Sequence, residues 1–133
     1  LLNKPIPIYG DGKNIRDWIY VEDHINALIK VALNGRIGDK YCIGGGQEKS
    51  NLEIVDLICE FLDYENKSNA PHSRLKLFVN DRLGHDKRYS INSKKIKEEL
   101  NWMPRYDFSD AIISTIKWYI NNIDWCNKYI KNI

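Results

Sequence analysis

The sequence predicts a mixed α/β fold in which short strands are interleaved with helices in one small domain. The chain has 133 residues, enough for one domain with a modest core and too few for two. Apolar residues recur at every second position in short runs and at every third or fourth position in longer runs, which are the periods of strands and helices. Hydrophobic residues at 43% and charged residues at 29% are ordinary for a globular protein. We therefore expect a single α/β or α+β domain over residues 1–133, with one or two layers.

Short β-prone runs separated by turn residues are predicted to be the strands. The first run leads into a glycine-rich turn at Gly10 and Gly12. The third ends at three consecutive glycines, and the last alternates leucine and valine with other side chains. The predicted strands cover residues 6–9, 18–21, 40–43 and 75–79.

About four helices are predicted, and their ends carry recognisable signals. The first begins near Glu22, and Gly35 ends it. The second begins at a capping box made by Ser50 and Glu53. The third is short and covers residues 96–100, and the last starts with Ser109 as its N-cap. The first helix carries one apolar face, which consists of Val21, Ile25, Leu28, Ile29, Ala32 and Leu33.

Composition argues against several classes of protein. A net charge of +2 with scattered Lys and Arg gives no reason to expect a nucleic-acid partner. No apolar run approaches the roughly 20 residues of a membrane span, so no membrane partner is expected. The three cysteines form no Cys-x-x-Cys pair, and the three histidines lack ligand spacing, so no metal-binding residues are predicted. Without a secretory leader, we expect a cytoplasmic protein. Because the chain begins with Leu1 and not Met, we expect a fragment of a longer protein.

Two motifs that could serve a dinucleotide cofactor are weak. The glycines at 44–46 follow a predicted strand and precede a helix, but they lack the Gly-x-x-Gly spacing of a cofactor loop. They predict a tight backbone crossing next to a ligand or a neighbouring domain. Tyr9 and Lys13 match the Tyr-x-x-x-Lys pair of short-chain dehydrogenases, yet the two glycines between them destroy the shared helix face that this pair needs. We predict no cofactor-binding and no catalytic residues in this chain.

One charged segment is unusual, residues 80–89, with the sequence Asn-Asp-Arg-Leu-Gly-His-Asp-Lys-Arg-Tyr. By charge alone it is a solvated loop, and His72, which precedes it, is expected to be solvated too. Arginine side chains that reach a cleft are nevertheless suited to a diphosphate, because the guanidinium is planar, permanently charged and bidentate. Arg16 is a second candidate of this kind, with an ion pair to Asp17 as the simpler interpretation.

Several separated motifs resemble the C-terminal region of extended short-chain dehydrogenase/reductases that act on nucleotide sugars. The wording Arg-Asp-Trp-x-Tyr-Val-Glu-Asp-His at 16–24, Asn-Leu-Glu-Ile-Val at 51–55 and Asp-Arg-x-Gly-His-Asp-x-Arg-Tyr at 81–89 is similar to that of dTDP-glucose 4,6-dehydratases in particular. Further motifs are Lys-Pro-Ile-Pro-Ile-Tyr-Gly at 4–10, Tyr-Cys-Ile-Gly-Gly at 41–45 and Leu-Asn-Trp-Met-Pro at 100–104. The match runs from about residue 4 to about residue 119.

The resemblance implies a set of substrate-binding residues. Tyr9 and Pro7 would flank the base or ribose of a dTDP-sugar, and Arg16 and Arg82 would clamp its diphosphate. A helix N-terminus together with two guanidiniums suits such a dianion. Polar contacts would be added by Asn51, in the first turn of its helix, and by His85.

The resemblance also implies a reaction that this chain cannot perform alone. The family oxidises the sugar at C4 with bound NAD, eliminates water across C5 and C6, and returns the hydride to C6, giving dTDP-4-keto-6-deoxyglucose from dTDP-glucose. NAD would be bound by an N-terminal Rossmann domain, which would also carry the catalytic residues and would be a partner of this domain. The full-length protein is expected to be a homodimer. We expect the chain by itself to be inactive.

Two alternatives remain open from the sequence. The chain could be the same region of a sibling enzyme that acts on another nucleotide sugar, such as a UDP-glucuronate decarboxylase or a 4-epimerase. It could also be a non-catalytic binding module that uses the same surface.

Overall fold

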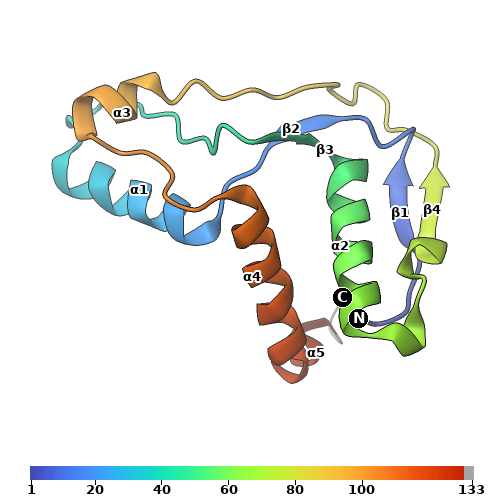
Figure 1. Cartoon of the computed structure of the whole chain (residues 1–133). Helices are drawn as coiled ribbons and strands as arrows, with labels where there is room; N and C mark the ends of the chain where they lie inside the picture. The colour runs from blue at the N-terminus through green and yellow to red at the C-terminus, as the bar shows by residue number, and fades with distance from the viewer. Residues whose placement is uncertain (131–133) are drawn as a thin grey trace.

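The computed structural model describes residues 1–130 and confirms the mixed α/β fold (Figure 1). Five α-helices are present in this part of the chain, one more than the sequence predicts. In chain order the elements are β1 (Ile6–Tyr9), β2 (Ile15–Asp17), α1 (Val21–Asn34), β3 (Glu48–Ser50), α2 (Asn51–Glu65), η1 (Lys67–Asn69), η2 (His72–Leu75), β4 (Lys76–Val79), α3 (Lys94–Leu100), α4 (Phe108–Asn121) and α5 (Ile123–Ile130), where η1 and η2 are single 3₁₀ turns. None of the helices in the described residues has the length and apolar character needed to cross a membrane.

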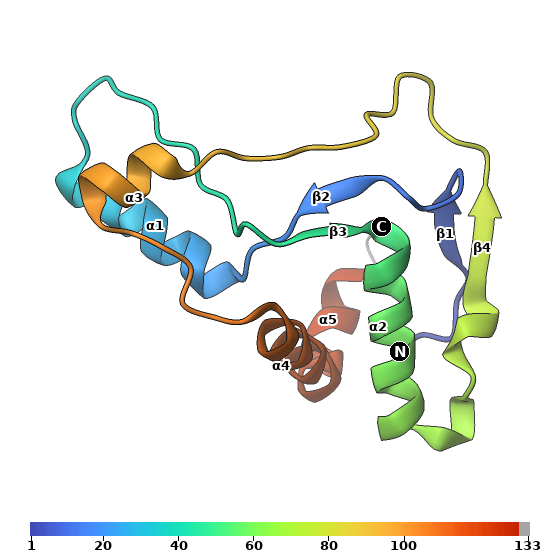
Figure 2. The same ribbon diagram turned by 45° about the horizontal axis from the view of Figure 1, so that its top comes forward.

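The strands form two separate pairs. β1 and β4 run parallel, with Tyr9 opposite Val79, and α2 belongs to the long connection that a parallel pair requires. β2 and β3 run antiparallel, with Arg16 opposite Lys49. In Figures 1 and 2, α2 lies beside the β1–β4 pair at one end of the molecule, and α1 and α3 lie together at the other end. Two long irregular segments, residues 36–47 and 80–93, connect the ends.

Two predicted strands are wrong. Residues 40–43 are irregular, and residues 18–20 lead directly into α1, which begins at Val21. The strand in this part of the chain is β2, which ends just before the predicted strand at 18–21. Its partner β3 has the polar sequence Glu-Lys-Ser. Such a strand carries no apolar alternation, so the sequence pattern could not find it. Trp18 still anchors this region, because its indole Nε1 donates to the carbonyl of Lys49 at 3.1 Å.

The glycines at 44–46 are a close backbone crossing, as the sequence predicts, but the neighbour is the chain itself. A Cβ atom at Gly45 would lie 2.0 Å from the carbonyl oxygen of Trp18, and one at Gly44 would lie 2.5 Å from Oδ2 of Asp17. The space beside Gly44 and Gly45 is therefore filled by Asp17, Trp18 and Ile91 of the same chain, whereas the space beside Gly46 is open. The described residues do not fit the pyrophosphate of a dinucleotide at this point.

Helix α1 has the predicted bounds, but its contacts differ from a simple amphipathic helix. The buried residues are Asp23 and Ala27, and Ala27 packs with Ile96 and Trp102 in the core cluster. The Asp23 carboxylate accepts hydrogen bonds from the backbone N–H groups of Arg105 and Tyr106, at 3.0 and 3.2 Å. Much of the apolar face is exposed by about half or more, namely Val21, Ile25, Leu28, Ile29 and Leu33.

Helix α2 begins as the sequence predicts. Oγ of Ser50 accepts from the Glu53 N–H at 3.2 Å, and the Glu53 carboxylate accepts from the Ser50 N–H at 2.7 Å. The buried side chains of α2 are Ile54, Cys59 and Leu62. Helix α4 starts two residues earlier than predicted, because Asp107 and not Ser109 is the N-cap, and its carboxylate accepts from the Ser109 N–H.

An apolar cleft of about 820 Å³ lies where α2 and α4 face the segment that leads into α1. Aromatic and aliphatic side chains line most of it, among them Trp18, Tyr20, Ile58, Phe108, Ile112 and Trp118. Together with the exposed face of α1, this cleft leaves a large apolar area in contact with solvent. A monomeric domain rarely exposes so much without a partner.

Candidate functional site

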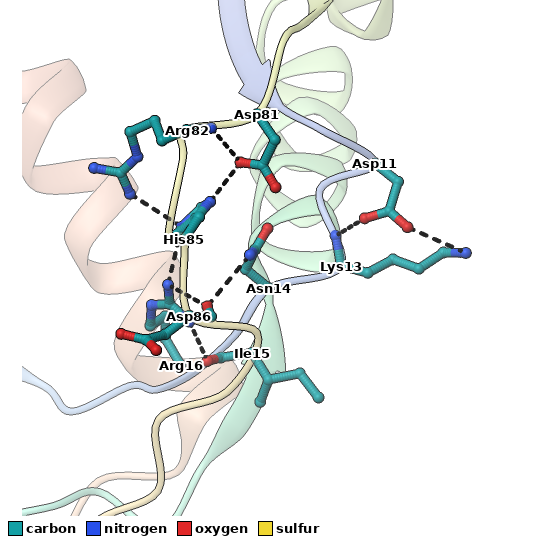
Figure 3. A network of polar contacts seen from close by, with 9 residues as sticks. All are labelled: Asp11, Lys13, Asn14, Ile15, Arg16, Asp81, Arg82, His85 and Asp86. Carbon is teal, nitrogen blue, oxygen red and sulfur yellow. Dashed lines mark hydrogen bonds and ion pairs between the residues drawn. The ribbon is translucent and has the colours of Figure 1, made fainter.

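Four of the six predicted site residues lie together in the structure: Tyr9, Arg16, Arg82 and His85. Nη2 of Arg16 and Nη2 of Arg82 each lie 3.0 Å from Nε2 of His85. The Arg82 guanidinium lies over the Tyr9 ring at 5.1 Å, and the Tyr9 and His85 rings meet edge to face at 6.4 Å. Figure 3 shows the Arg82 guanidinium at the upper left of the His85 ring and the Arg16 guanidinium below it, with both approaching the same ring nitrogen. Side chains from β1, β2 and the loop after β4 therefore form one cluster.

The charged loop lies against β2 because backbone hydrogen bonds hold it there. The Ile15 N–H donates to the carbonyl of Lys87 at 2.8 Å, and the Tyr89 N–H donates to the carbonyl of Ile15 at 3.1 Å. Arg88 adds a two-pronged ion pair with Glu48 on β3, with both N–O distances 2.8 Å. The loop is thus fixed along β2, although all of residues 80–89 except His85 are exposed to solvent, as the simpler interpretation expects.

The remaining two predicted residues lie nearby without a hydrogen bond to this cluster among the described side chains. Pro7 is exposed on β1, two positions before Tyr9, so both side chains point to the same face of the strand. Asn51 is the first residue of α2, and its backbone N–H donates to the carbonyl of Asn14 at 3.1 Å. The Leu52 N–H donates to the carbonyl of Gly12, so the N-terminus of α2 meets the turn that follows β1.

Sequence reasoning missed Asn14, Asp81, Asp86 and Tyr89. Asn14 is buried, and its amide donates to the carbonyl of Asp86, which also accepts from Arg16 Nη2 at 3.1 Å. Arg16 lies over the Tyr89 ring at 4.5 Å, and the Tyr89 hydroxyl donates to Asp86. Asp81, Asp86 and Tyr89 all lie in the 81–89 motif, so that motif was the available signal.

The simpler interpretation of Arg16, a pair with Asp17, is wrong. Oδ1 of Asp17 accepts from the backbone N–H of Gln47 at 3.0 Å, across the β2–β3 pair. Arg16 turns the other way, where its Nη1 donates to its neighbour's carbonyl, that of Ile15, at 2.7 Å. Adjacent residues on a strand point to opposite faces, which separates the two side chains.

The electrostatics of the cluster favour an anion. The hydrogen bond from His85, and next the Arg82 backbone N–H, lower the pKa of the Asp81 carboxyl below its ordinary value. The hydrogen bond to Asp86 raises the pKa of the Tyr89 hydroxyl, so this ring stays neutral at physiological pH. Among the described residues the Arg82 guanidinium has a hydrogen-bond contact only with His85, so its other donors are available for a ligand, whereas Arg16 already donates to the carbonyls of Ile15 and Asp86. Such an arrangement can hold a phosphate or diphosphate group with charge-assisted hydrogen bonds.

Tyr9 and Lys13 do not form a short-chain dehydrogenase pair, in agreement with the sequence analysis. Tyr9 is the last residue of β1. Lys13 lies in the turn that follows, where its backbone N–H donates to Asp11 at 2.9 Å and its ammonium pairs with the same carboxylate. The two side chains therefore share no helix face.

Comparison with known proteins agrees with the resemblance seen in the motifs. The profile of the family described as GDP-mannose 4,6 dehydratase matches residues 1–115. A dTDP-glucose 4,6-dehydratase of Haemophilus influenzae is 47% identical over 126 residues, which are 92% of this chain and 37% of the relative. One of Xanthomonas campestris is 42% identical over 127 residues, which are 94% of this chain and 36% of the relative. The chain thus spans little more than a third of the length of these relatives.

A solved structure gives the same result for the fold. The dTDP-glucose 4,6-dehydratase of Streptomyces venezuelae, crystallised with NAD and TYD bound, has a TM-score of 0.79 and 38% identity, with 92% of this chain and 36% of that chain covered. The resemblance to dTDP-glucose 4,6-dehydratases is therefore confirmed in sequence and in structure. With its profile matched over residues 1–115, the chain belongs to the GDP-mannose 4,6 dehydratase family.

Proposed function

We propose that this chain is the nucleotide-sugar-binding part of a dTDP-glucose 4,6-dehydratase and forms a single domain over residues 1–133. The observation that carries the proposal is the cluster in which Arg16 and Arg82 converge on His85, beside the Tyr9 ring. Two guanidiniums next to an exposed aromatic face suit a ligand that joins a diphosphate to a base. The full-length protein would convert dTDP-glucose to dTDP-4-keto-6-deoxyglucose.

Each site residue has a role that follows from its chemistry. Arg16 and Arg82 bind the diphosphate, and each charge-assisted hydrogen bond contributes about 1.5–3 kcal/mol. Tyr9 and Pro7 offer an exposed ring and a rigid apolar surface to the base or ribose. His85 and Asn51 supply polar contacts, and Asn51 does so from the N-terminus of α2, where the helix dipole favours an anion.

The chemical steps belong to the part of the protein that this chain lacks. NAD supplies hydride transfer in the family, and it would be bound by an N-terminal Rossmann domain together with the catalytic residues. Gly44 and Gly45 lie against other residues of the chain, which supports a cofactor site elsewhere. This chain binds and orients the nucleotide sugar and is inactive by itself. We propose a homodimer in the cytoplasm for the full-length protein, as the family resemblance implies.

The apolar cleft supports a surface of this chain on which the proposed N-terminal cofactor domain would pack. The chain spans about 36% of its relatives' length, and the cleft and the exposed face of α1 are the apolar surfaces on which a further domain could pack. Burial of apolar area contributes about 25 cal/mol per Å², so a cofactor domain that covered these surfaces would be held firmly.

Calorimetric titration of the chain with dTDP, and with UDP as the competing nucleotide, tests the proposal. We expect dTDP to bind in preference to UDP, and Arg82→Ala to weaken binding by about 10- to 100-fold, because a charge-assisted contact is lost. Arg74→Ala is the matched control: Arg74 is an exposed arginine in η2 that donates to Asn3 at 2.7 Å, so its removal should leave the affinity unchanged.

Other outcomes of the titration separate the alternatives. Preference for UDP would favour a sibling enzyme that acts on UDP-sugars. A folded chain that binds neither nucleotide would contradict a preformed site. Formation of the 4-keto product by the chain with NAD and dTDP-glucose would refute its inactivity.

A further inference from the structure

Asp81 lies behind His85, on the side away from the two guanidiniums (Figure 3). Its Oδ1 lies 2.6 Å from Nδ1 of His85 and accepts from the Arg82 backbone N–H at 2.8 Å. The other face of the carboxylate packs on Gly10, where a Cβ atom would lie 3.0 Å from Oδ2. Gly10 has a φ of +58°, a conformation that other residues adopt at a cost. The carboxylate is thus held in place from both the loop and the turn after β1.

The position of this carboxylate decides which nitrogen of His85 carries the proton. An ionised carboxylate only accepts hydrogen bonds, so Nδ1 of the ring must be the donor. In a neutral imidazole the other nitrogen, Nε2, then offers a lone pair. Nε2 is the atom that lies 3.0 Å from Nη2 of both Arg16 and Arg82, and guanidinium groups only donate.

The other states of the ring do not satisfy these contacts. The Nε2–H tautomer would place a ring N–H against two guanidinium donors and a lone pair against the carboxylate of Asp81. A protonated ring would keep the bond to Asp81 but would also face both guanidiniums with a donor and a positive charge. The other groups near the ring do not change this result, since Tyr9 contacts it through its aromatic ring in an edge-to-face arrangement and the Asp86 carboxylate accepts from Tyr89.

We propose that Asp81 is a positioning residue of the anion site, which fixes the Nδ1–H tautomer of His85 and so makes Nε2 the common acceptor for Arg16 and Arg82. The two guanidiniums repel each other, and they come from segments far apart in the sequence. A shared acceptor holds both in one orientation before a ligand arrives, which lowers the ordering cost of binding. The inference rests on the proposed function only for the identity of the anion, a nucleoside diphosphate.

Imidazole ¹⁵N NMR of the chain tests the tautomer directly, because it distinguishes a protonated from an unprotonated ring nitrogen. Signals of the three histidines are assigned by replacing each in turn. We expect the Nδ1–H tautomer for His85 in the wild type, its loss in Asp81→Ala, and its recovery in Asp81→Glu. In Asp81→Asn, which keeps the side-chain shape if the alanine variant does not fold, we expect a mixture, because an amide can turn either its oxygen or its NH₂ group to Nδ1.

Titration with dTDP gives the second readout. We expect Asp81→Ala to bind dTDP about tenfold more weakly, the lower end of the effect typical of residues that orient a binding group. Asp11→Ala is the matched control, because Asp11 is an exposed carboxylate in the neighbouring turn whose one partner among the described residues is Lys13. It should change neither the tautomer nor the affinity.

The outcomes separate this inference from the proposed function. An Nε2–H tautomer in the wild type, or an Asp81→Ala variant with unchanged tautomer and unchanged dTDP affinity, overturns the role of Asp81. A wild type in which Asp81 controls the tautomer but dTDP does not bind supports the positioning role and overturns the proposed ligand.

Discussion

His72 and His85 each pair with an aspartate through the same ring atom, Nδ1, but the surroundings of the two rings differ. Nδ1 of His72 lies 2.5 Å from Oδ1 of Asp63, and Nδ1 of His85 lies 2.6 Å from Oδ1 of Asp81. Both side chains are almost fully buried, with 8% and 6% of their surface exposed. His72 faces a small pocket lined in part by Leu1, Leu62 and Ile120, whereas the second nitrogen of His85 faces two arginines.

This difference shows that an aspartate–histidine pair does not by itself identify a functional site. At His72 the carboxylate of Asp63 also accepts from the backbone N–H of the same residue at 2.7 Å, so the pair ties η2 to the end of α2. At His85 the pair orients a ring whose second nitrogen, Nε2, lies within hydrogen-bond distance of two cations, half-buried Arg16 and exposed Arg82. A structural pair and a binding pair are distinguished by the groups that the second ring nitrogen, Nε2, contacts.

Replacing each histidine by alanine should give the largest separation between the two pairs. We expect His72→Ala to lower the free energy of unfolding by about 3 kcal/mol, because a buried ring and its hydrogen bond are lost. His85→Ala should cost about 1 kcal/mol, since its other partners are the guanidiniums of half-buried Arg16 and exposed Arg82, which water can solvate. Urea denaturation followed by circular dichroism measures both. Equal losses would mean that His85 is as much a structural residue as His72.

Weakening the first turn of α2 should lower the stability less than His72→Ala does. The loosened backbone should lie near His85 and not near His72. Ser50→Ala removes one half of the capping box and should cost about 1 kcal/mol of stability. Because the N-terminus of α2 meets the turn after β1, amide exchange should rise at residues 12–14 and 50–53 and stay unchanged near His72. Ser73→Ala is a control at an exposed serine next to His72. Amide exchange that rises equally near His72 and at residues 12–14 and 50–53 would contradict the separation of the two regions.

The smallest expected effect is a difference in stability at acid pH between the wild type and Asp63→Asn. Hydrogen bonds from the backbone N–H and then the ring of His72 lower the pKa of the Asp63 carboxyl below its ordinary value. A lowered folded-state pKa stabilises the fold above the unfolded-state value of about 3.9, and this contribution is lost as the pH falls through the folded-state pKa. Between about pH 5 and pH 2, Asp63→Asn should therefore lose less stability than the wild type. If the stability of the two proteins fell in parallel over this pH range, the ionised Asp63 carboxylate would not be what stabilises the fold there.

Several features of the fold and of the site could be predicted from the sequence because they depend on neighbouring residues. The Ser50–Glu53 capping box and the strand Ile6–Tyr9 are local signals, and both are confirmed. The 81–89 motif identified a charged segment that lies beside Arg16 and Tyr9 in the structure. The substrate contacts of Pro7 and Asn51 stay predictions.

Other features could not be predicted because they depend on residues distant in the chain. His72 follows a proline in a polar stretch, which suggests exposure, yet Asp63 and the end of α2 bury it. The strand pairing of residues 15–17 with 48–50 has no apolar alternation and exists because backbone groups of two polar segments meet.

The sequence by itself determined the α/β class, the position of most helices and the family, since periodicity, caps and motif wording are written in consecutive residues. Only the tertiary structure decided which face of α1 is buried and which carboxylate holds His85. The physical reason is that a side chain's partners come from packing: Ala27 reaches the core because α3 and Trp102 lie there, and Asp81 reaches His85 because the loop is pinned along β2.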